Sequence, residues 1–414
     1  MLQDLIYVCV VSNYNLPDFE SCLLRKPKHV VLVVSDYEPV RQGAERLQSQ
    51  LELVLEGVVV HRPDKEKKFN GRSFSGCKTW VDDCLIPYLN GLENYPRACN
   101  ITGGTKLNTL TLAVPKLNWS WLDYKDEDHS LQKLEFKHNE LVCVATESLA
   151  SASPIDVAKL SSNEVKEVEP NRLIAKQEAL SVELAQELWD ALSTPQSIQG
   201  KALLELFRNK KTGLEAAWLF GAFTPSTKAG MLSLSAKEFI DQDEFNSAQL
   251  AWLKQWHALA NESIKAEPHS LLLPSKAMKN DFKRWLSGDW LEQLIGVWLL
   301  DKIKPKAITM NLKINPLKDE KSSTGERETD IVVHDKGRTT VIEVKTDLAP
   351  GHKVKDLLQQ ITSLGERLGR TRKVLMIGPQ LQQKIQHQMH DVEKRCKADQ
   401  VILCRNKEEL LQIF

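Results

Sequence analysis

The sequence predicts an α/β protein built from a parallel N-terminal sheet, a helical middle segment and a C-terminal α/β domain. Three observations predict this organisation. Apolar strand patterns alternate with helical patterns over residues 1–146, as in parallel sheets that are buried on both faces. A second group of strands and helices occupies residues 271–414, and helical patterns dominate between the two. At 414 residues, 42% hydrophobic and 27% charged, the chain is long enough for two or three domains.

The first 146 residues predict a Rossmann-like sheet that ends in a hairpin. Each of the early apolar runs is followed by an amphipathic segment, which is the pattern of repeated strand–helix units. The last two runs are separated only by Lys-His-Asn-Glu, so they predict two antiparallel strands. Strands are expected at 5–11, 30–34, 58–60, 98–101, 131–136 and 141–145, and helices at 17–24, 40–55, 79–92 and 107–116.

Two loops of this domain have the composition of a ligand site. Ligands of open parallel sheets bind beyond the carboxyl ends of the strands where the winding reverses, typically between the first and fourth strands. The first strand ends in Ser12 and Asn13, and the fourth leads into Thr-Gly-Gly-Thr-Lys at 102–106, at the start of a helix. Glycines allow close approach to the backbone, and a helix N-terminus offers N–H donors to phosphate. The alternative is a purely structural strand-to-helix turn.

Two common nucleotide-binding motifs are missing from this domain. The sequence contains no G-x-x-x-x-G-K-[ST] and no G-x-G-x-x-G. These motifs supply the backbone cradle for the phosphates of ATP and of dinucleotides. The sequence therefore disfavours ATP hydrolysis and NAD binding.

Residues 147–270 form the least informative part of the sequence. The Ser-, Ala- and Pro-rich start and the charged residues after it predict a linker over 147–170. A long helix is expected at 171–192, and helical stretches follow over 199–257. Three tryptophans there occupy mostly apolar positions, which favours core packing over base stacking, and a small winged-helix module is left open. These tryptophans are Trp218, Trp252 and Trp256.

The stretch from Glu328 to Lys345 predicts a β-hairpin. Its two β-branched runs flank Asp-Lys-Gly-Arg, a turn-like cluster. If the loop holds an even number of residues, Asp330 lies opposite Glu343, and both side chains share one face of the sheet with Lys345. An odd loop in a regular ladder would separate them.

The facing carboxylates predict a site for a divalent cation. Two carboxylates at about 5 Å repel each other unless a cation lies between them. Carboxylate oxygens suit Mg²⁺ or Mn²⁺, which are commonly held by one or two carboxylates together with substrate phosphate. Lys345 can then orient an attacking water or neutralise charge on the phosphate, and Glu328 can assist. The alternative is a solvated hairpin with mixed charges.

An upstream helix predicts a third carboxylate for the same site. Residues 287–289, Ser-Gly-Asp, have the composition of a helix cap, and residues 290–300 continue as an almost wholly apolar helix. Glu292 aligns with Ile295 and Leu299 on a face that we expect to be buried. A buried carboxylate needs a partner, which a metal site supplies. The alternative is a glutamate at the solvent edge of the helix.

These residues resemble the PD-(D/E)xK nuclease superfamily, in which a helix with a buried Glu precedes a strand Asp and a Glu-x-Lys strand. Glu328-Thr-Asp330 stands where the family name has its Pro. The resemblance implies a restriction-endonuclease-like α/β domain at 271–414 that hydrolyses phosphodiester bonds with Mg²⁺ or Mn²⁺. The implied catalytic residues are Glu292, Asp330, Glu343 and Lys345, of which the three carboxylates are the implied metal ligands.

The rest of this domain fits the resemblance. Many relatives carry a site glutamine on the helix after the hairpin, and Gln359 and Gln360 are the candidates in the helical segment 354–364. A strand at 373–378, a helix at 380–398 and a final strand at 401–404 are expected to complete the core.

The N-terminal loops followed by a nuclease half resemble CRISPR-associated Rossmann fold (CARF) proteins, in particular those with a C-terminal PD-(D/E)xK domain. The resemblance implies that residues 1–146 bind a cyclic oligoadenylate, with cyclic tetra-adenylate as the expected ring. It further implies an ancillary nuclease of a type III CRISPR system, acting on DNA or RNA and switched on by this effector. A symmetric ring makes equal contacts only with a patch presented twice, which favours a homodimer. The implied effector contacts are Ser12, Asn13, Thr102, Gly103, Gly104, Thr105 and Lys106.

Composition limits the alternatives. A net charge of zero argues against a general nucleic-acid binder, although residues 271–414 hold 26 Lys and Arg against 19 Asp and Glu. The eight cysteines form no C-x-x-C pair, so we expect reduced core residues of a cytoplasmic protein without zinc. No apolar run approaches membrane-spanning length, and the first residues lack a basic, signal-like segment.

Two rival functions stay open at this point. One is a ligand-sensing transcription regulator, which would bind DNA through the middle helices and cut nothing. The other is a constitutive repair or restriction nuclease, which would cut without any oligoadenylate. Neither explains both loops of the N-terminal site as well as an effector-gated nuclease does.

Overall fold

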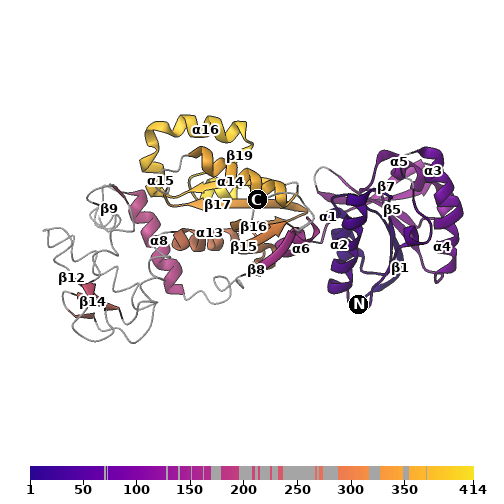
Figure 1. The fold of residues 1–414 in the computed structure, drawn as a ribbon, viewed down its shortest axis with the longest axis horizontal. Coiled ribbons are helices and arrows are strands. Elements are labelled where there is room, and N and C mark those ends of the chain that lie inside the picture. Colours follow the sequence, from indigo (N-terminus) through magenta and orange to yellow (C-terminus); the bar gives the residue numbers. More distant parts are fainter. Residues whose placement is uncertain are drawn as a thin grey trace.

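The computed structural model contains two α/β units that lie next to each other along the long axis of the molecule (Figure 1). It describes residues 1–69, 71, 73–126, 129–138, 140–150, 152–161, 163–168, 179–194, 288–316, 327–347, 354–369 and 371–414, together with short strands between 208 and 273. Within these residues, no helix is both long and apolar enough to cross a membrane.

The N-terminal unit is a seven-stranded sheet in the order β3-β2-β1-β4-β5-β6-β7. The first five strands are parallel, and the last two form the predicted antiparallel hairpin. The first and fourth strands are neighbours, which confirms the predicted reversal of the winding. The strands are β1 (Gln3–Val10), β2 (Pro27–Val33), β3 (Val59–His61), β4 (Arg97–Asn100), β5 (Trp121–Lys125), β6 (Ser130–Lys137) and β7 (Glu140–Ser148).

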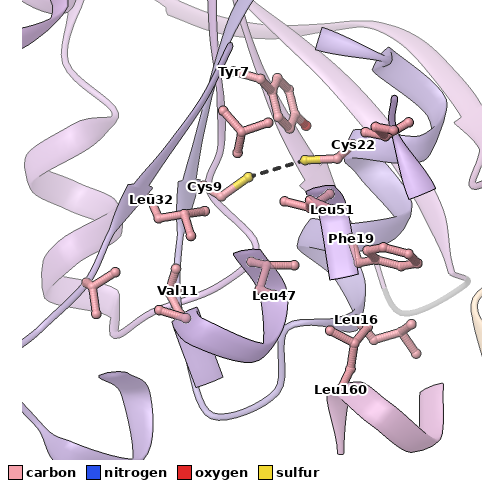
Figure 2. Packing of buried hydrophobic residues seen from close by; sticks show 14 of the residues in the cluster. Tyr7, Cys9, Val11, Leu16, Phe19, Cys22, Leu32, Leu47, Leu51 and Leu160 are labelled. Atoms are coloured by element: carbon pink, nitrogen blue, oxygen red, sulfur yellow. Dashed lines mark hydrogen bonds between the residues drawn. The ribbon is translucent and has the colours of Figure 1, made fainter. Parts of the chain in front are cut away.

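Helices cover both faces of this sheet because successive residues of β1 point in opposite directions. Tyr7 and Cys9 pack with α1 and α2, and Figure 2 shows the Cys9 and Cys22 thiols in contact at 3.7 Å within this core. Ile6 and Val8 pack against the other helices. The helices are α1 (Leu16–Arg25), α2 (Glu38–Val54), α3 (Phe74–Trp80), α4 (Ile86–Gly91) and α5 (Lys106–Leu112), with a π-helical segment at Val81–Leu85.

Four points differ from the expectations. The helix expected at 79–92 begins at Phe74, and the helix expected at 107–116 ends at Leu112. Strand β5 was not predicted, because its five residues follow a short, turn-rich segment. The eight cysteines are free thiols and seven are buried, but Cys143 on β7 is exposed.

The C-terminal unit is a six-stranded sheet in the order β19-β18-β17-β16-β15-β8. The apolar residues of its central strands are buried, and α14 packs over β17 and β18. The strands are β8 (Asn163–Val168), β15 (Ile308–Pro316), β16 (Arg327–Asp335), β17 (Arg338–Lys345), β18 (Thr371–Ile377) and β19 (Val401–Cys404). The helices are α8 (Ala179–Ser193), α13 (Trp290–Leu300), α14 (Val354–Arg367), α15 (Pro379–Lys384), α16 (Met389–Ala398) and α17 (Lys407–Leu411).

The segment expected to be a linker, 147–170, is folded where the structure describes it. It contains α6 (Pro154–Leu160), which begins with a capping box between Ser153 and Asp156. The strand after it, β8, pairs antiparallel with β15 and forms the edge of the C-terminal sheet. Leu160 packs in the core of the N-terminal unit (Figure 2), and Ala158 packs in the core of the C-terminal unit. Helix α6 therefore joins the two hydrophobic cores.

Two further expectations concern the C-terminal helices and the middle of the chain. The helix expected at 380–398 is divided into α15 and α16 by a 3₁₀ turn at Gln386–Gln388. The expected winged-helix module and its three tryptophans lie outside the described residues. The short strands there are β9 (Arg208–Asn209), β10 (Gly213–Leu214), β11 (Thr224–Pro225), β12 (Leu232–Ser235), β13 (Ala266–Glu267) and β14 (Ser270–Leu273).

Candidate functional site

The register of the β16–β17 hairpin is the one predicted for an even loop. The ladder runs from Asp335 opposite Arg338 to Ile331 opposite Ile342, so the turn is the two-residue pair 336–337. Both turn residues have positive φ, +48° and +70°, which is the backbone of a type I′ turn, and Gly favours this conformation. Continuing the ladder by one pair brings Asp330 opposite Glu343.

Asp330, Glu343 and Lys345 meet on one side of the sheet, as predicted. The Lys345 Nζ lies 2.7 Å from Glu343 Oε1 and 3.5 Å from Asp330 Oδ2. The backbone N–H of Val344 donates to Asp330 Oδ2 at 2.7 Å. The hairpin thus fixes two carboxylates and an ammonium close together. We call these three residues and Glu292 the acidic cluster.

The helix after the hairpin supplies a glutamine to this cluster. Gln360 Nε2 donates to Glu343 Oε1 at 3.0 Å, whereas Gln359 is exposed. The structure therefore selects Gln360 from the two predicted candidates. Sequence periodicity did not separate them, because the two residues are adjacent on a helix whose exact rotation depends on packing.

Glu292 lies on α13 and is half-buried. Burial raises its pKa well above the ordinary range, and the negative charges of Asp330, Asp289 and Glu343 raise it further, while Lys345 opposes them. Helix α13, which carries Glu292, packs against β16 and β17, the strands of Asp330 and Glu343. Asp289 occupies the N-cap position, but its side chain makes no capping hydrogen bond.

The acidic cluster is short of positive charge. Burial, then the charge of Asp330, raises the pKa of Glu343 to about 7, although Lys345 opposes the shift. Burial also raises the pKa of Asp330, against Lys345 and the Val344 N–H. Burial lowers the pKa of Lys345, but Asp330 and Glu343 outweigh it and raise that pKa above its ordinary value. The pKa values rise because ionising all three carboxylates around one ammonium would leave a net negative charge in a poorly solvated place.

The donors of the acidic cluster fit a hard divalent cation in their chemistry. The Glu343 Oε2 atom is buried and has no hydrogen-bond partner among the residues that the structure describes. An unpaired buried oxygen is energetically costly, and a bound cation would remove this cost. Carboxylate oxygens are the ligands that Mg²⁺ and Mn²⁺ prefer. The carboxylates are not already arranged around one ion position: within the described residues, no three His, Cys, Asp or Glu side chains form such a group. The Lys345 ammonium contacts both strand carboxylates instead.

A cavity of about 950 Å³ lies between the two units, at the carboxyl ends of β1 and β4. Of the seven predicted ligand residues, four line it: Ser12, Thr102, Gly103 and Gly104. Asn13, Thr105 and Lys106 are not among the lining residues, and the Thr105 side chain accepts from the Asn108 N–H as the cap of α5.

The two glycines of this loop are required by close packing against β1. A Cβ on Gly103 would collide with the backbone oxygen of Val10, and a Cβ on Gly104 would collide with the Val10 side chain. Gly104 also has a φ of +77°, a conformation that other residues rarely adopt. Any side chain here would displace the loop that lines the cavity.

The C-terminal unit supplies the opposite wall of the cavity, which the sequence did not reveal. The wall contains the hairpin turn at Gly337 and Arg338, and the start of β18 with Arg372 and Lys373. Spacing along the chain carries no information on how two units pack, so this wall could not be expected from local patterns. The available indication in the sequence was the excess of Lys and Arg over Asp and Glu in residues 271–414.

A buried polar network joins the two units next to the cavity. His334 Nε2 lies 2.7 Å from Glu20 Oε1, and both side chains are fully buried. Lys125 Nζ lies 3.4 Å from Glu20 Oε2 and donates to the backbone oxygen of Gly337 at 3.0 Å. The hairpin that carries Asp330 and Glu343 is therefore anchored to the N-terminal unit at its turn.

Comparison with solved structures shows a shared fold over nearly the whole chain. The protein VC1899 from Vibrio cholerae is 17% identical with a TM-score of 0.66, covering 98% of this chain and 95% of that one. Can2 from Sulfobacillus thermosulfidooxidans, in complex with cyclic tetra-adenylate, is 15% identical with a TM-score of 0.60, covering 98% and 97%. No protein-family model matches the sequence, and no curated protein matches it.

Proposed function

We propose that this protein is a metal-dependent nuclease controlled by a cyclic oligoadenylate that binds in the cavity between its two units. The observation that carries the proposal is the acidic cluster, in which a two-residue turn aligns Asp330, Glu343 and Lys345 on one side of the sheet. A cluster of carboxylates with a lysine suits metal-assisted hydrolysis of phosphodiesters.

Each residue of the acidic cluster has a separate role in this proposal. Asp330 and Glu343, assisted by Glu292, would hold Mg²⁺ or Mn²⁺, and the bound ion would lower the pKa of a water and polarise the scissile phosphate. Glu343 must be deprotonated for this role. Gln360 fixes the orientation of the Glu343 carboxylate through its hydrogen bond. Lys345 places its ammonium beside both strand carboxylates, where it can stabilise negative charge that develops on the phosphate.

The proposed effector is cyclic tetra-adenylate. The cavity lies at the strand ends of the parallel sheet, where ligands of such folds bind. Four cationic side chains line it, Lys125, Arg338, Arg372 and Lys373, against two acidic ones, Asp126 and Glu366. This balance favours an anionic ligand. Can2, which shares the fold, was solved with cyclic tetra-adenylate. A symmetric ring favours binding across a homodimer, and the biological role that we propose is that of a CRISPR ancillary nuclease.

The test is a cleavage assay on labelled single-stranded DNA, duplex DNA and RNA with Mn²⁺, with and without cyclic oligoadenylates of different ring size. We expect cleavage that requires both Mn²⁺ and one ring size, and that is lost in Glu343→Gln. Metal-independent binding of a defined duplex without cleavage would instead support a transcription regulator. Cleavage that ignores every oligoadenylate would support a constitutive nuclease.

A further inference from the structure

The cavity wall from the C-terminal unit begins with Arg338, the first residue of β17. Its side chain is exposed and lines the cavity. Lys125 is occupied by Glu20 and the Gly337 carbonyl. Arg372 donates to the backbone oxygen of Ile413, and Lys373 donates to that of Asp399. Arg338 lines the cavity from the tip of the hairpin. The two-residue turn before it fixes the position of its backbone.

The opposite end of the same strand carries the acidic cluster. Glu343 and Lys345 follow Arg338 by five and seven residues along β17, which is about 17 Å and 23 Å at the rise of an extended strand. A paired strand is a rigid element of the kind that can carry coupling between two sites. A ligand bound to Arg338 would therefore act on the element that positions the catalytic residues.

One residue connects the ligand loop to the hairpin. The Lys125 backbone N–H donates to Thr102 Oγ1 at 2.8 Å, and the Lys125 side chain donates to the Gly337 carbonyl. Thr102 belongs to the strand-end loop of the N-terminal unit, and Gly337 directly precedes Arg338. The two walls of the cavity are thus linked through the main chain and the side chain of Lys125.

We propose that Arg338 binds a phosphate of the effector, so that the C-terminal unit completes the binding site through the turn of its catalytic hairpin. The inference rests on the proposed function for the class of ligand, an anionic cyclic oligonucleotide. A guanidinium suits this role because it forms paired hydrogen bonds to phosphate oxygens. Arg338 is then the residue through which binding reaches β17.

Binding of labelled cyclic tetra-adenylate to the full-length protein, measured in EDTA at several salt concentrations, tests this assignment. We expect Arg338→Ala to weaken binding by at least about tenfold, as for a lost hydrogen bond to a charged group. The slope of log affinity against log salt should fall by about 0.7, the value for one lost phosphate contact to a single strand. Arg338→Lys should restore part of the affinity and most of the slope.

The matched control is Arg395→Ala, which removes an exposed arginine on α16 outside the cavity. It should leave the affinity and the salt slope within twofold of the wild type. Equal affinity and slope in wild type and Arg338→Ala would overturn the assignment while leaving the proposed effector intact. Failure of the wild type to bind any cyclic oligoadenylate would overturn the proposed effector and, with it, the assignment of Arg338.

Discussion

Replacing Glu343 with Gln should stabilise the metal-free protein at pH 8 while it removes nuclease activity. The Glu343 side chain is 1% exposed, and burial raises its pKa from 4.5 to about 7. The folded protein therefore holds more protons than the unfolded chain between about pH 4.5 and pH 7, so its free energy of unfolding falls as the pH rises through this range. Above pH 7 the ionised carboxylate is a net cost.

The size of this cost follows from the pKa shift. One pKa unit corresponds to about 1.4 kcal/mol, so a shift from 4.5 to about 7 costs about 3 kcal/mol at pH 8. The ion pair with Lys345 is already included, because it opposes the shift without cancelling it. Gln keeps the shape of Glu and can still accept a hydrogen bond from Lys345. The stabilisation should vanish near pH 4.5, where the folded wild type carries a neutral side chain as well.

Hydrogen exchange of the β17 amides in EDTA is the assay, because it reports the opening free energy of this hairpin and not that of the whole chain. About 3 kcal/mol corresponds to roughly a hundredfold higher protection factor in Glu343→Gln at pH 8. The control Glu393→Gln removes a glutamate from an exposed pair with Arg405, which should change stability by less than about 1 kcal/mol. Lower protection in Glu343→Gln at pH 8, or an equal gain at pH 4.5, would refute the reasoning.

Three further predictions follow from the same geometry. Mn²⁺ affinity, measured by titration calorimetry, should fall by up to about tenfold for each pH unit below pH 7, since Glu343 must lose its proton to bind the ion. An affinity that does not change from pH 6 to 8 would exclude Glu343 as a ligand. Gly104→Ala should weaken effector binding by about tenfold without changing Mn²⁺ affinity, because the φ of Gly104 is +77° and the added Cβ would collide with Val10. Unchanged effector binding would show that this loop is not part of the binding site. His334→Ala should destabilise the interface between the two units by about 1–3 kcal/mol, because the buried Glu20 loses a hydrogen bond. The same change should reduce maximal activation by the effector more than it reduces effector affinity. Normal activation would show that the network is only structural.

Much of the acidic cluster could be predicted from the sequence because strand geometry has a fixed period. Alternation of side chains and an even turn are sufficient to bring Asp330, Glu343 and Lys345 to one side, and the structure has this arrangement. The position of Glu292 was harder, because α13 is apolar on all faces and its rotation depends on packing. The site residues on strands could therefore be predicted from the sequence more directly than the site residue on a helix.

Contacts between the two units could not be predicted. The residues that form the second wall of the cavity are more than 200 positions from the first wall in the chain, and no local pattern relates them. The assignment of 147–170 as a linker was wrong for a different reason. Its small residues resemble a linker, but Ser153 and Asp156 have the spacing of a capping box, and that spacing could have indicated the start of α6.

The most direct test of the central claim is anomalous diffraction from crystals of the full-length protein soaked in Mn²⁺. We expect a manganese peak that contacts carboxylate oxygens of Asp330 and Glu343 at about 2.1–2.2 Å, and that is absent from crystals of Glu343→Gln. A peak elsewhere, or no peak beside these carboxylates at saturating Mn²⁺, would contradict the proposal.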